Sequence, residues 1–305
     1  MSYARRLPSL DGLRGIAAIA VMLFHFNDFF LPQAHLSDIV PLLGRAYLAV
    51  DLFFLLSRFV MAHVYGRLLA SNWRAHCVQF ATARFARIYP LFALMTLAMF
   101  VVFVLSGTPL NQVSLSGRSL ALQPFLLQHW SSGLSWDYPS WSISTEAEAY
   151  VFFVFSAGLL VTGKYPRLMA ICCIAILATL SITNGRSLIF FHGFPALLRT
   201  LSEFSLGALI YRAHLSDEGL LRKWAGILTI LLMGLAAVTR LDFVIVCAFG
   251  CLISYGVNNT GGVGKAAKLS PLGCSRQLVI FNLSLARAHT LRCHGHVCRE
   301  WLSDQ

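Results

Sequence analysis

The sequence DGLRGIAAIAVMLFH, residues 11–25, is an apolar run with one arginine near its start and one histidine at its end. Its composition predicts a membrane-embedded helix. Successive residues of an α-helix are about 100° and 1.5 Å apart, so Arg14 and His25 would lie about 20° apart around the axis and about 16 Å apart along it. The two side chains therefore share one face, with Arg14 near a membrane surface and His25 well inside the bilayer.

The composition of the whole chain also indicates a membrane protein. Of its 305 residues, 57% are hydrophobic and only 12% are charged, which is too few charges to cover the surface of a soluble protein of this length. The net charge is +11. Because the basic residues fall between apolar runs, we expect them to face the cytoplasm and anionic lipid headgroups. Membrane lipids, and not nucleic acid, are the partners that this pattern predicts.

The predicted fold is an all-α, polytopic bundle of about eight transmembrane helices. The candidate spans are residues 15–31, 46–64, 88–105, 144–162, 168–182, 196–211, 224–238 and 243–257. Lysines and arginines are concentrated before the first span and in alternate loops, which predicts a cytoplasmic N-terminus in the inner (plasma) membrane. The longest outer loop, residues 106–141, is a candidate binding loop.

Two pairs of ionisable residues lie within predicted spans. Asp51 and Arg58 are seven positions apart and nearly share a face, and an ion pair between them is the simplest interpretation. A charge at a helix centre costs about 2.5–3.5 kcal/mol on insertion scales, so Arg58 must have a partner or water. Arg199 and Glu203, four positions apart, form a second candidate pair.

Basic residues at helical spacing precede the third span, in RFARIYP (residues 84–90). Arg84 and Arg87 are three positions apart, so they share a helical face. Their guanidinium groups suit phosphate, which favours a cytoplasmic site for a polyphosphate ligand. The alternative is that the two arginines are ordinary membrane anchors.

The stretch SWSISTEAEAY, residues 140–150, opens the fourth span. Thr145 and Glu148 fit a capping box, whereas Glu146 is left over as a functional candidate in the first turn. We expect Glu146 to approach the membrane at the level where the helix of His25 leaves it.

These stretches, in this order, resemble the membrane acyltransferase-3 family of bacterial O-acyltransferases. The resemblance covers residues 7–258 and rests on LDGLRGIAAIAVMLFH, VDLFFLLSRFV, FARIYP and SWSISTEAEAY, with LRTLSEFSLGALIY as a looser match. It implies transfer of an acyl group, commonly acetyl, from cytoplasmic acetyl-CoA to a hydroxyl of a surface or exported carbohydrate. Acyl-CoA would be a donor substrate and not a tightly bound cofactor.

The resemblance also implies a role for each candidate residue. Arg14, Arg84 and Arg87 would hold the phosphates of the donor. His25 would act deeper in the membrane, as a general base or as a transient acyl carrier. Glu146 would orient His25 or the acceptor sugar.

Two features depart from the family. Arg58 stands where the family usually has a glycine. We predict that residues 259–305 form a basic cytoplasmic tail. The family usually has about ten transmembrane helices, and the tail lacks the further helices that this number requires. We therefore divide the chain into an acyltransferase domain (1–258) and this tail. Our hypothesis for this tail is a frameshift or truncation in the coding sequence. The Cys293–Cys298 segment, CHGHVC, lacks the spacing of a standard zinc site, so we predict no metal site. The alternative functions are a transporter or flippase of a lipid-linked sugar or acyl group, a scaffolding membrane protein, or an inactive truncated acyltransferase.

Overall fold

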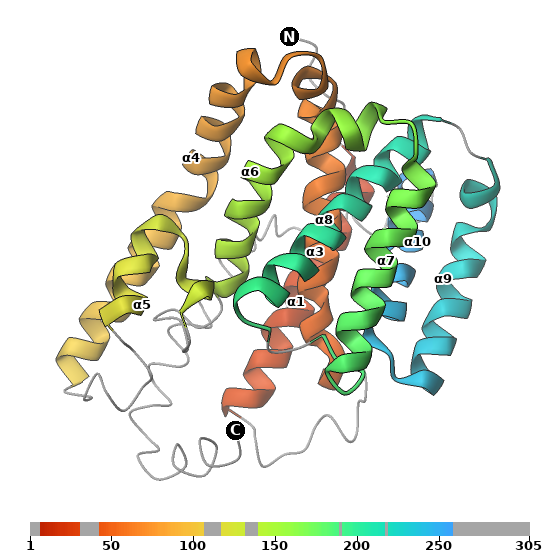
Figure 1. The fold of residues 1–305 in the computed structure, drawn as a ribbon. Helices are drawn as coiled ribbons and strands as arrows, with labels where there is room; N and C mark the ends of the chain where they lie inside the picture. The colour runs from red at the N-terminus through yellow and green to blue at the C-terminus, as the bar shows by residue number, and fades with distance from the viewer. Residues whose placement is uncertain are drawn as a thin grey trace.

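The computed structural model describes residues 7–30, 43–106, 117–131, 140–188, 191–216 and 219–258. All regular secondary structure in these ranges is helical (Figure 1). The elements are α1 (Pro8–Phe30), η2 (Leu43–Leu48), α3 (Ala49–Met61), η3 (Ala62–Gly66), α4 (Arg67–Ser106), α5 (Gly117–Leu122), η4 (Gln123–Phe125), η5 (Gln128–Trp130), α6 (Trp141–Thr162), α7 (Pro166–Thr183), α8 (Gly193–Leu215), α9 (Gly219–Thr239) and α10 (Asp242–Asn258). The predicted tail, residues 259–305, lies outside the described residues.

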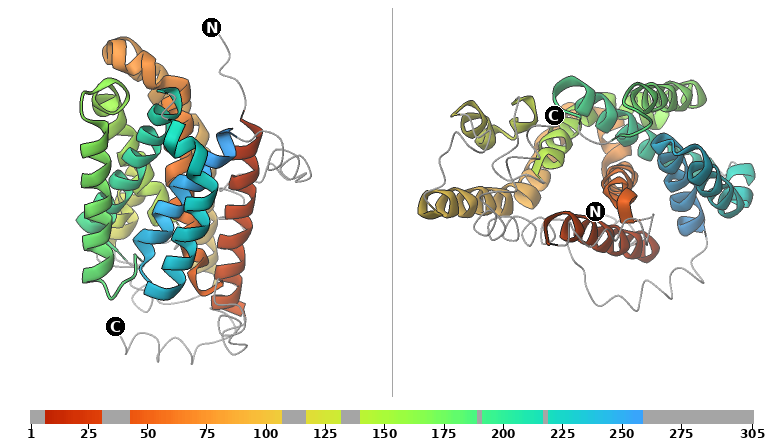
Figure 2. Two further views of the ribbon diagram at one scale, coloured as in Figure 1. Left: turned by 90° about the vertical axis from the view of Figure 1, so that its right-hand side faces the viewer. Right: turned by 90° about the horizontal axis from the view of Figure 1, so that it is seen from below.

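Helix α3 lies at the centre of the bundle and packs against α1 on one side and α8 on the other. Helix α6 packs against α4 and α8, while α10 packs against α9, α8 and α7. Seen along the bundle, α4 lies at one end and α9 at the other, with α1 covering a side of α3 (Figure 2). Residues of α1, α3 and α8 thus meet in one core.

The close approach of α3 and α8 depends on Gly207. A Cβ atom at this position would lie 2.3 Å from the carbonyl oxygen of Leu55 and 2.9 Å from Cβ of Arg58. Any larger side chain would therefore push the two helices apart. A glycine in the interior of a helix is unfavourable on its own, so its value here is the close packing that it permits.

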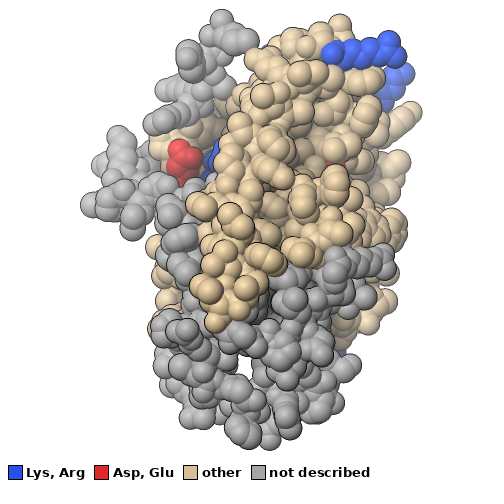
Figure 3. All heavy atoms as spheres, turned by 90° about the vertical axis from the view of Figure 1, so that its left-hand side faces the viewer, with Lys and Arg blue, Asp and Glu red and all other residues tan. Residues whose placement is uncertain are grey.

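The structure confirms an all-α membrane protein. Four segments are long and apolar enough to cross a membrane by length and composition: Pro8–Asn27, Gly44–Val102, Trp141–Thr162 and Pro166–Thr183. Helices α9 and α10 include shorter apolar stretches, Lys223–Thr239 and Asp242–Asn258. Helix α8, with 23 residues, is long enough to cross a membrane, but it carries the buried charged residues Arg199 and Glu203. On the face drawn in Figure 3, the described surface is almost entirely uncharged, and lysine and arginine side chains gather at its top.

The stretch between the second and third predicted spans is not a loop. It begins as a π-helical turn at η3 and continues as α4, whose backbone leaves helical geometry at Asn72 (φ −156°, ψ 87°). The side chains of Val78 and Phe85 are 71% and 56% exposed, although they lie close to Arg84 and Arg87 in sequence. This mixture of exposed apolar and basic residues is typical of a helix at a membrane surface. Arg84 and Arg87 are therefore on a helix and not in a loop.

Part of the predicted outer loop, 106–141, is also ordered. Within its described residues, α5, η4 and η5 form short helical turns, and Gln128 and His129 are buried. Element η5 packs against α6 and α8. The loop therefore forms part of the bundle wall.

Candidate active site

The carboxylate of Glu146 is held by two hydroxyl groups. Ser57 of α3 donates a hydrogen bond to Oε1 over 2.9 Å, and Tyr150 of α6 donates to the same oxygen over 2.8 Å. Glu146 is only 8% exposed. Hydrogen bonds donated from two different helices fix the orientation of this carboxylate.

Three arginines lie near Glu146 or near Tyr150, which binds it. The charges of Arg87 and Glu146 both act on the guanidinium of Arg14, and the charges of Arg84, Arg87 and Glu146 act on Tyr150. Arg14 Nη2 also donates a hydrogen bond to the carbonyl oxygen of Leu56, over 3.4 Å. The structure thus brings four of the five predicted site residues together, from α1, α4 and α6.

An aromatic cluster supports the α4 side of this group. The Arg84 guanidinium lies 5.3 Å from the ring centroid of Tyr65 and 5.9 Å from that of Phe80. Phe80 in turn packs edge-on against Tyr150 and Phe153 of α6. Arg84 is partly buried on these rings, whereas Arg87 is exposed. Arg84 is therefore packed on the aromatic cluster, while Arg87 is accessible.

His25 lies on the same helix as Arg14, near the other end of α1. It is partly buried, and its ring packs edge-on against Phe24, which contacts Tyr47 of η2. Because α1 is continuous, the predicted offset of about 16 Å between Arg14 and His25 applies. A polar stripe with Arg14 at one end and His25 at the other is consistent with this geometry.

The position of Glu146 differs from our expectation. We expected it beside the outer end of the helix that carries His25. Instead, Glu146 accepts a hydrogen bond from Ser57 of α3. The preceding residue of α3, Leu56, accepts a hydrogen bond from Arg14 at its carbonyl oxygen. Glu146 therefore lies at the level of Arg14 in the bundle. Element η5 lies against the same end of α6, where Gln128 donates a hydrogen bond to the Ser140 carbonyl and His129 Nδ1 lies 2.7 Å from Ser144 Oγ.

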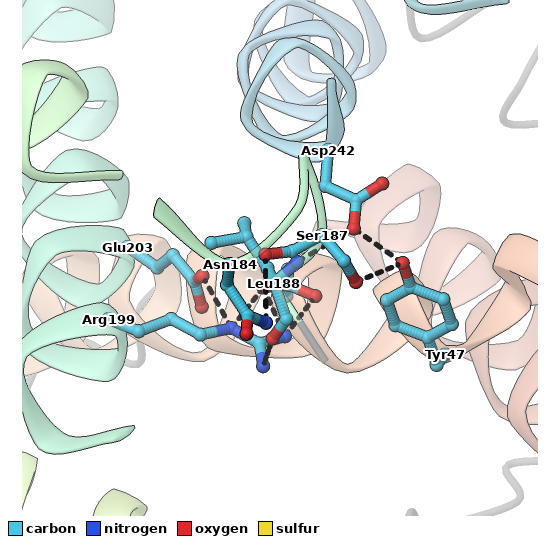
Figure 4. A network of polar contacts seen from close by, with 8 residues as sticks. Tyr47, Asn184, Ser187, Leu188, Arg199, Glu203 and Asp242 are labelled. Atoms are coloured by element: carbon cyan, nitrogen blue, oxygen red, sulfur yellow. Dashed lines mark hydrogen bonds and ion pairs between the residues drawn. The ribbon is translucent and has the colours of Figure 1, made fainter. Parts of the chain in front are cut away.

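The buried ion pairs also differ from those expected. Asp51 binds Arg199 of α8, with Nη2 2.6 Å from both carboxylate oxygens, and does not pair with Arg58. The expected pair of Arg199 with Glu203 is present, at 3.2 Å. Figure 4 shows Arg199 between Glu203 and the Leu188 carbonyl, which accepts a hydrogen bond from Nη1.

A third carboxylate, that of Asp242, extends this network. Asp242 at the start of α10 accepts hydrogen bonds from the Tyr47 hydroxyl and from the Leu188 backbone N–H, the latter over 2.8 Å (Figure 4). Ser187 Oγ also lies 3.1 Å from the Tyr47 hydroxyl. These contacts join η2, α3, α8 and α10, so their evident role is structural.

No carboxylate or hydrogen-bond acceptor among the described residues balances the buried charge of Arg58. Its side chain is fully buried, and none of its three guanidinium nitrogens has a hydrogen-bond partner. The guanidinium carbon lies 3.1 Å from the ring centroid of Phe153 and 4.6 Å from that of Phe204. A desolvated cation–π contact is worth about 2 kcal/mol, whereas burying an ion costs several kcal/mol.

A buried histidine escaped the sequence analysis. Nδ1 of His129 in η5 lies 2.7 Å from Ser144 Oγ and 3.5 Å from Glu148 Oε1. Glu148 also accepts a hydrogen bond from the Trp130 indole, over 2.8 Å.

The predicted capping box is therefore wrong. Thr145 donates a hydrogen bond to the Ser142 carbonyl, and Glu148 connects η5 to α6 through Trp130. Loop residues lack a periodic pattern that would have revealed His129.

A known protein family covers most of this chain. The family model Acyl_transf_3, described as an acyltransferase domain, matches residues 7–269. The chain belongs to the acyltransferase-3 family. The match includes every candidate residue and ends eleven positions after the boundary that we predicted at residue 258.

Curated relatives of this acyltransferase-3 protein include proteins with named acyltransferase activities. It is 42% identical over 103 residues to "Protein 2 in picA locus" of Rhizobium radiobacter, covering 34% of this chain and 49% of that protein. It is 34% identical over 161 residues to the acyltransferase MdmB of Streptomyces mycarofaciens, covering 48% and 38%. It is 27% identical over 177 residues to the peptidoglycan O-acetyltransferase OatA of Listeria monocytogenes, covering 54% and 26%.

The matches are partial in length. In each of these three pairs, the alignment spans less than half of the relative. No solved structure matches the chain.

Proposed function

We propose that the chain is a membrane-bound O-acyltransferase that moves an acyl group, most simply acetyl, from acyl-CoA to a hydroxyl group of a carbohydrate. The observation that carries the proposal is the gathering of Arg14, Arg84 and Arg87 around the hydrogen-bonded pair Glu146 and Tyr150, in a family of acyltransferases. The named O-acetyltransferase among the relatives supports the carbohydrate acceptor.

The three arginines are suited to a phosphate-bearing donor. A guanidinium presents N–H groups in a planar fork that pairs with phosphate oxygens, and three of them match the several charges of CoA. The exposed position of Arg87 gives the donor access to the cluster. The positive charges before the first span favour a cytoplasmic donor site in the inner membrane.

His25 is the proposed catalytic group. As a general base, its neutral imidazole would take the proton of the acceptor hydroxyl while that oxygen attacks the thioester carbonyl. As a transient carrier, an imidazole nitrogen would attack the thioester, CoA would leave as the thiol, and the acceptor oxygen would then take the acyl group from the imidazole. Either route ends with one carbohydrate ester, free CoA and a neutral histidine.

Glu146 is proposed to position the donor site. Its hydrogen bonds to Ser57 and Tyr150 hold a negative charge beside Arg14. This charge offsets part of the repulsion between Arg14 and Arg87, which would otherwise separate α1 from α4. We therefore place Glu146 closer to the donor than to the acceptor.

The test is stoichiometric consumption of acetyl-CoA. Inverted membrane vesicles that contain the chain would receive acetyl-CoA and a glycan extract, and both released thiol and esterified glycan would be measured. We expect equal amounts of the two products, and a loss of both in the Arg84→Ala/Arg87→Ala variant but not in the Arg167→Ala control. Movement of a lipid-linked sugar without thiol release would instead identify a transporter or flippase.

A further inference from the structure

Three arginines meet at the C-terminal end of α9. Arg45 of η2 donates a hydrogen bond from Nη1 to the carbonyl oxygen of Ala236, over 3.2 Å. Arg186, in the turn that follows α7, donates from Nη1 to the carbonyl oxygen of Thr239, the last residue of α9, over 3.4 Å. Arg240 comes directly after that residue. These three arginines form the outer arginine cluster.

The outer arginine cluster lies at the end of the bundle that carries His25. Arg45 precedes Tyr47 by two positions in η2, and the ring centroid of Tyr47 lies 5.7 Å from that of Phe24. The ring centroid of Phe24 lies 5.3 Å from that of the adjacent His25. The Tyr47 hydroxyl donates to Asp242 at the start of α10 (Figure 4). Tyr47 therefore connects the cluster to the surroundings of His25.

Two members of the cluster have an unfavourable backbone conformation. Arg186 has a φ of 76° and Arg240 has a φ of 58°, both in the left-handed region. A Cβ atom is costly there, so glycine is usual at such positions, including the one that directly follows a helix. Both side chains are exposed and so contribute little to the core. Strain of this kind is typical of functional positions, and these two positions carry positive charge.

The described chain supplies little negative charge to the cluster. The C-terminal end of a helix such as α9 carries about half a negative charge, whereas each guanidinium carries a full positive charge. No carboxylate among the described residues forms an ion pair with Arg45, Arg186 or Arg240. The surplus of positive charge indicates an anionic ligand.

The place of the cluster favours the acceptor over the donor and over lipid. Arg14, in the proposed donor site, lies about 16 Å along α1 from His25. Anionic lipids give the cytoplasmic leaflet its negative surface potential, whereas the predicted orientation puts the cluster at the opposite membrane surface. A guanidinium fork pairs with a carboxylate or a phosphate ester, and a carbohydrate can carry either group.

We propose that the outer arginine cluster binds an acidic group on one sugar unit of the acceptor and so presents a hydroxyl of a neighbouring unit to His25. The acceptor is then an acidic glycan. This inference rests on the proposed function and names the class of its acceptor. The acidic group is unchanged by the transfer. The thioester bond to CoA breaks, the ester bond to the acceptor oxygen forms, and the hydroxyl proton passes through His25 to the CoA thiol.

The experiment measures acetyl transfer to acidic and neutral glycans. Full-length protein would be placed in nanodiscs of phosphatidylcholine and phosphatidylglycerol, which leave both faces accessible. It would receive labelled acetyl-CoA with the acidic or the neutral fraction of a glycan extract. Arg186→Gly combined with Arg240→Gly should raise the KM for the acidic fraction about 10-fold at low salt, with kcat and the KM for acetyl-CoA unchanged. Lys223→Gln, at the other end of α9, is the matched control and should leave all three constants unchanged.

The glycine variants also separate binding from folding. Because glycine adopts a left-handed backbone without strain, Arg240→Gly alone should unfold at no lower a temperature than the wild type. This single variant replaces the double variant if the latter does not fold, and it should raise the same KM about 3-fold.

Each outcome decides the assignment. An equal or lower KM for the neutral fraction, or an unchanged KM for the acidic fraction in the glycine variants, would overturn the role of the cluster and leave the proposed transferase intact. Loss of bound phosphatidylglycerol in these variants, with an unchanged KM, would also overturn it and assign the cluster to a lipid headgroup. Absence of label from both fractions with the wild type would contradict the proposed function itself.

Discussion

Arg199 Nη2 lies 2.6 Å from each carboxylate oxygen of Asp51, although the two residues are 148 positions apart in the sequence. Both side chains are almost completely buried. The pair joins the N-terminal part of α3 to α8, and Glu203 supplies a second acceptor one helical turn further along α8. This interaction fixes the helix that also carries Ser57 and Arg58.

Loss of the Asp51 charge should destabilise the fold. In Asp51→Asn, Arg199 keeps only Glu203 as a charged partner, and breaking one side of a buried ion pair costs about 3–5 kcal/mol. The measurement is the thermal unfolding midpoint of the purified protein in detergent. A midpoint equal to that of the wild type would show that the pair does not hold α3 to α8.

Removal of all three charges of the network is the control for this variant. Asp51→Leu combined with Arg199→Leu and Glu203→Leu leaves no unpaired ion at this position, so the triple variant should unfold at a higher temperature than Asp51→Asn. A triple variant that unfolds at a lower temperature than Asp51→Asn would contradict the assignment of the cost to an unpaired buried charge.

Removal of the Tyr150 hydroxyl should lower activity more than stability. Tyr150→Phe keeps the ring that packs on Phe80 but deletes one hydrogen bond to Glu146. A hydrogen bond to a charged group contributes about 1.5–3 kcal/mol, so we expect a fall in kcat/KM of roughly 10-fold or more. Acyl transfer from acetyl-CoA measures this. Thr162→Ala, whose hydroxyl bonds only within its own helix at Gly158, should be unaffected.

Arg87 should contribute mainly to donor binding. Because it is exposed, Arg87→Ala should raise the KM for acetyl-CoA with little change in kcat, by about 5- to 30-fold at low salt. Salt screens exposed charges, so the difference from the wild type should shrink as ionic strength rises. A salt-independent fall in kcat alone would contradict a phosphate contact.

His129 should make the fold sensitive to mild acid. Burial, followed by the nearby His192, lowers the pKa of His129 from its ordinary value of 6.5 to about 4. The unfolded chain then binds more protons than the folded one between these two pH values. The contribution of His129 to stability is therefore complete above about pH 6.5 and falls, by up to about 3 kcal/mol, as the pH drops to about 4.

The measurement is the unfolding midpoint as a function of pH. In His129→Gln the slope between pH 6.5 and 4 should be reduced relative to the wild type. An unchanged slope would show that other groups cause the acid sensitivity.

Features encoded locally in the sequence were predicted well. The apolar runs predicted helices, and the spacing of Arg14 and His25 placed both residues on one continuous helix. The spacing of Arg84 and Arg87 predicted a helical face, although the surrounding stretch was expected to be a loop. Local periodicity is sufficient for such predictions because it depends only on residues within a few turns.

Features that depend on packing between distant segments were not predicted. Residues seven positions apart on one helix, such as Asp51 and Arg58, are separated by about 10 Å along its axis. This distance is unfavourable for an ion pair, even though the two residues lie on nearly the same face. The true partner, Arg199, lies on α8, which packs closely against α3 at Gly207. The burial of His129 likewise depends on how η5 folds against α6 and α8.

A labelling assay can show whether His25 takes part in acyl transfer to a carbohydrate. Membrane vesicles with wild-type protein or His25→Ala would be given acetyl-CoA labelled in the acetyl group together with a glycan extract, and label in the glycan would be counted. We predict that the wild type labels the glycan and that His25→Ala, inserted in equal amount, does not. Equal labelling by both proteins would contradict the account.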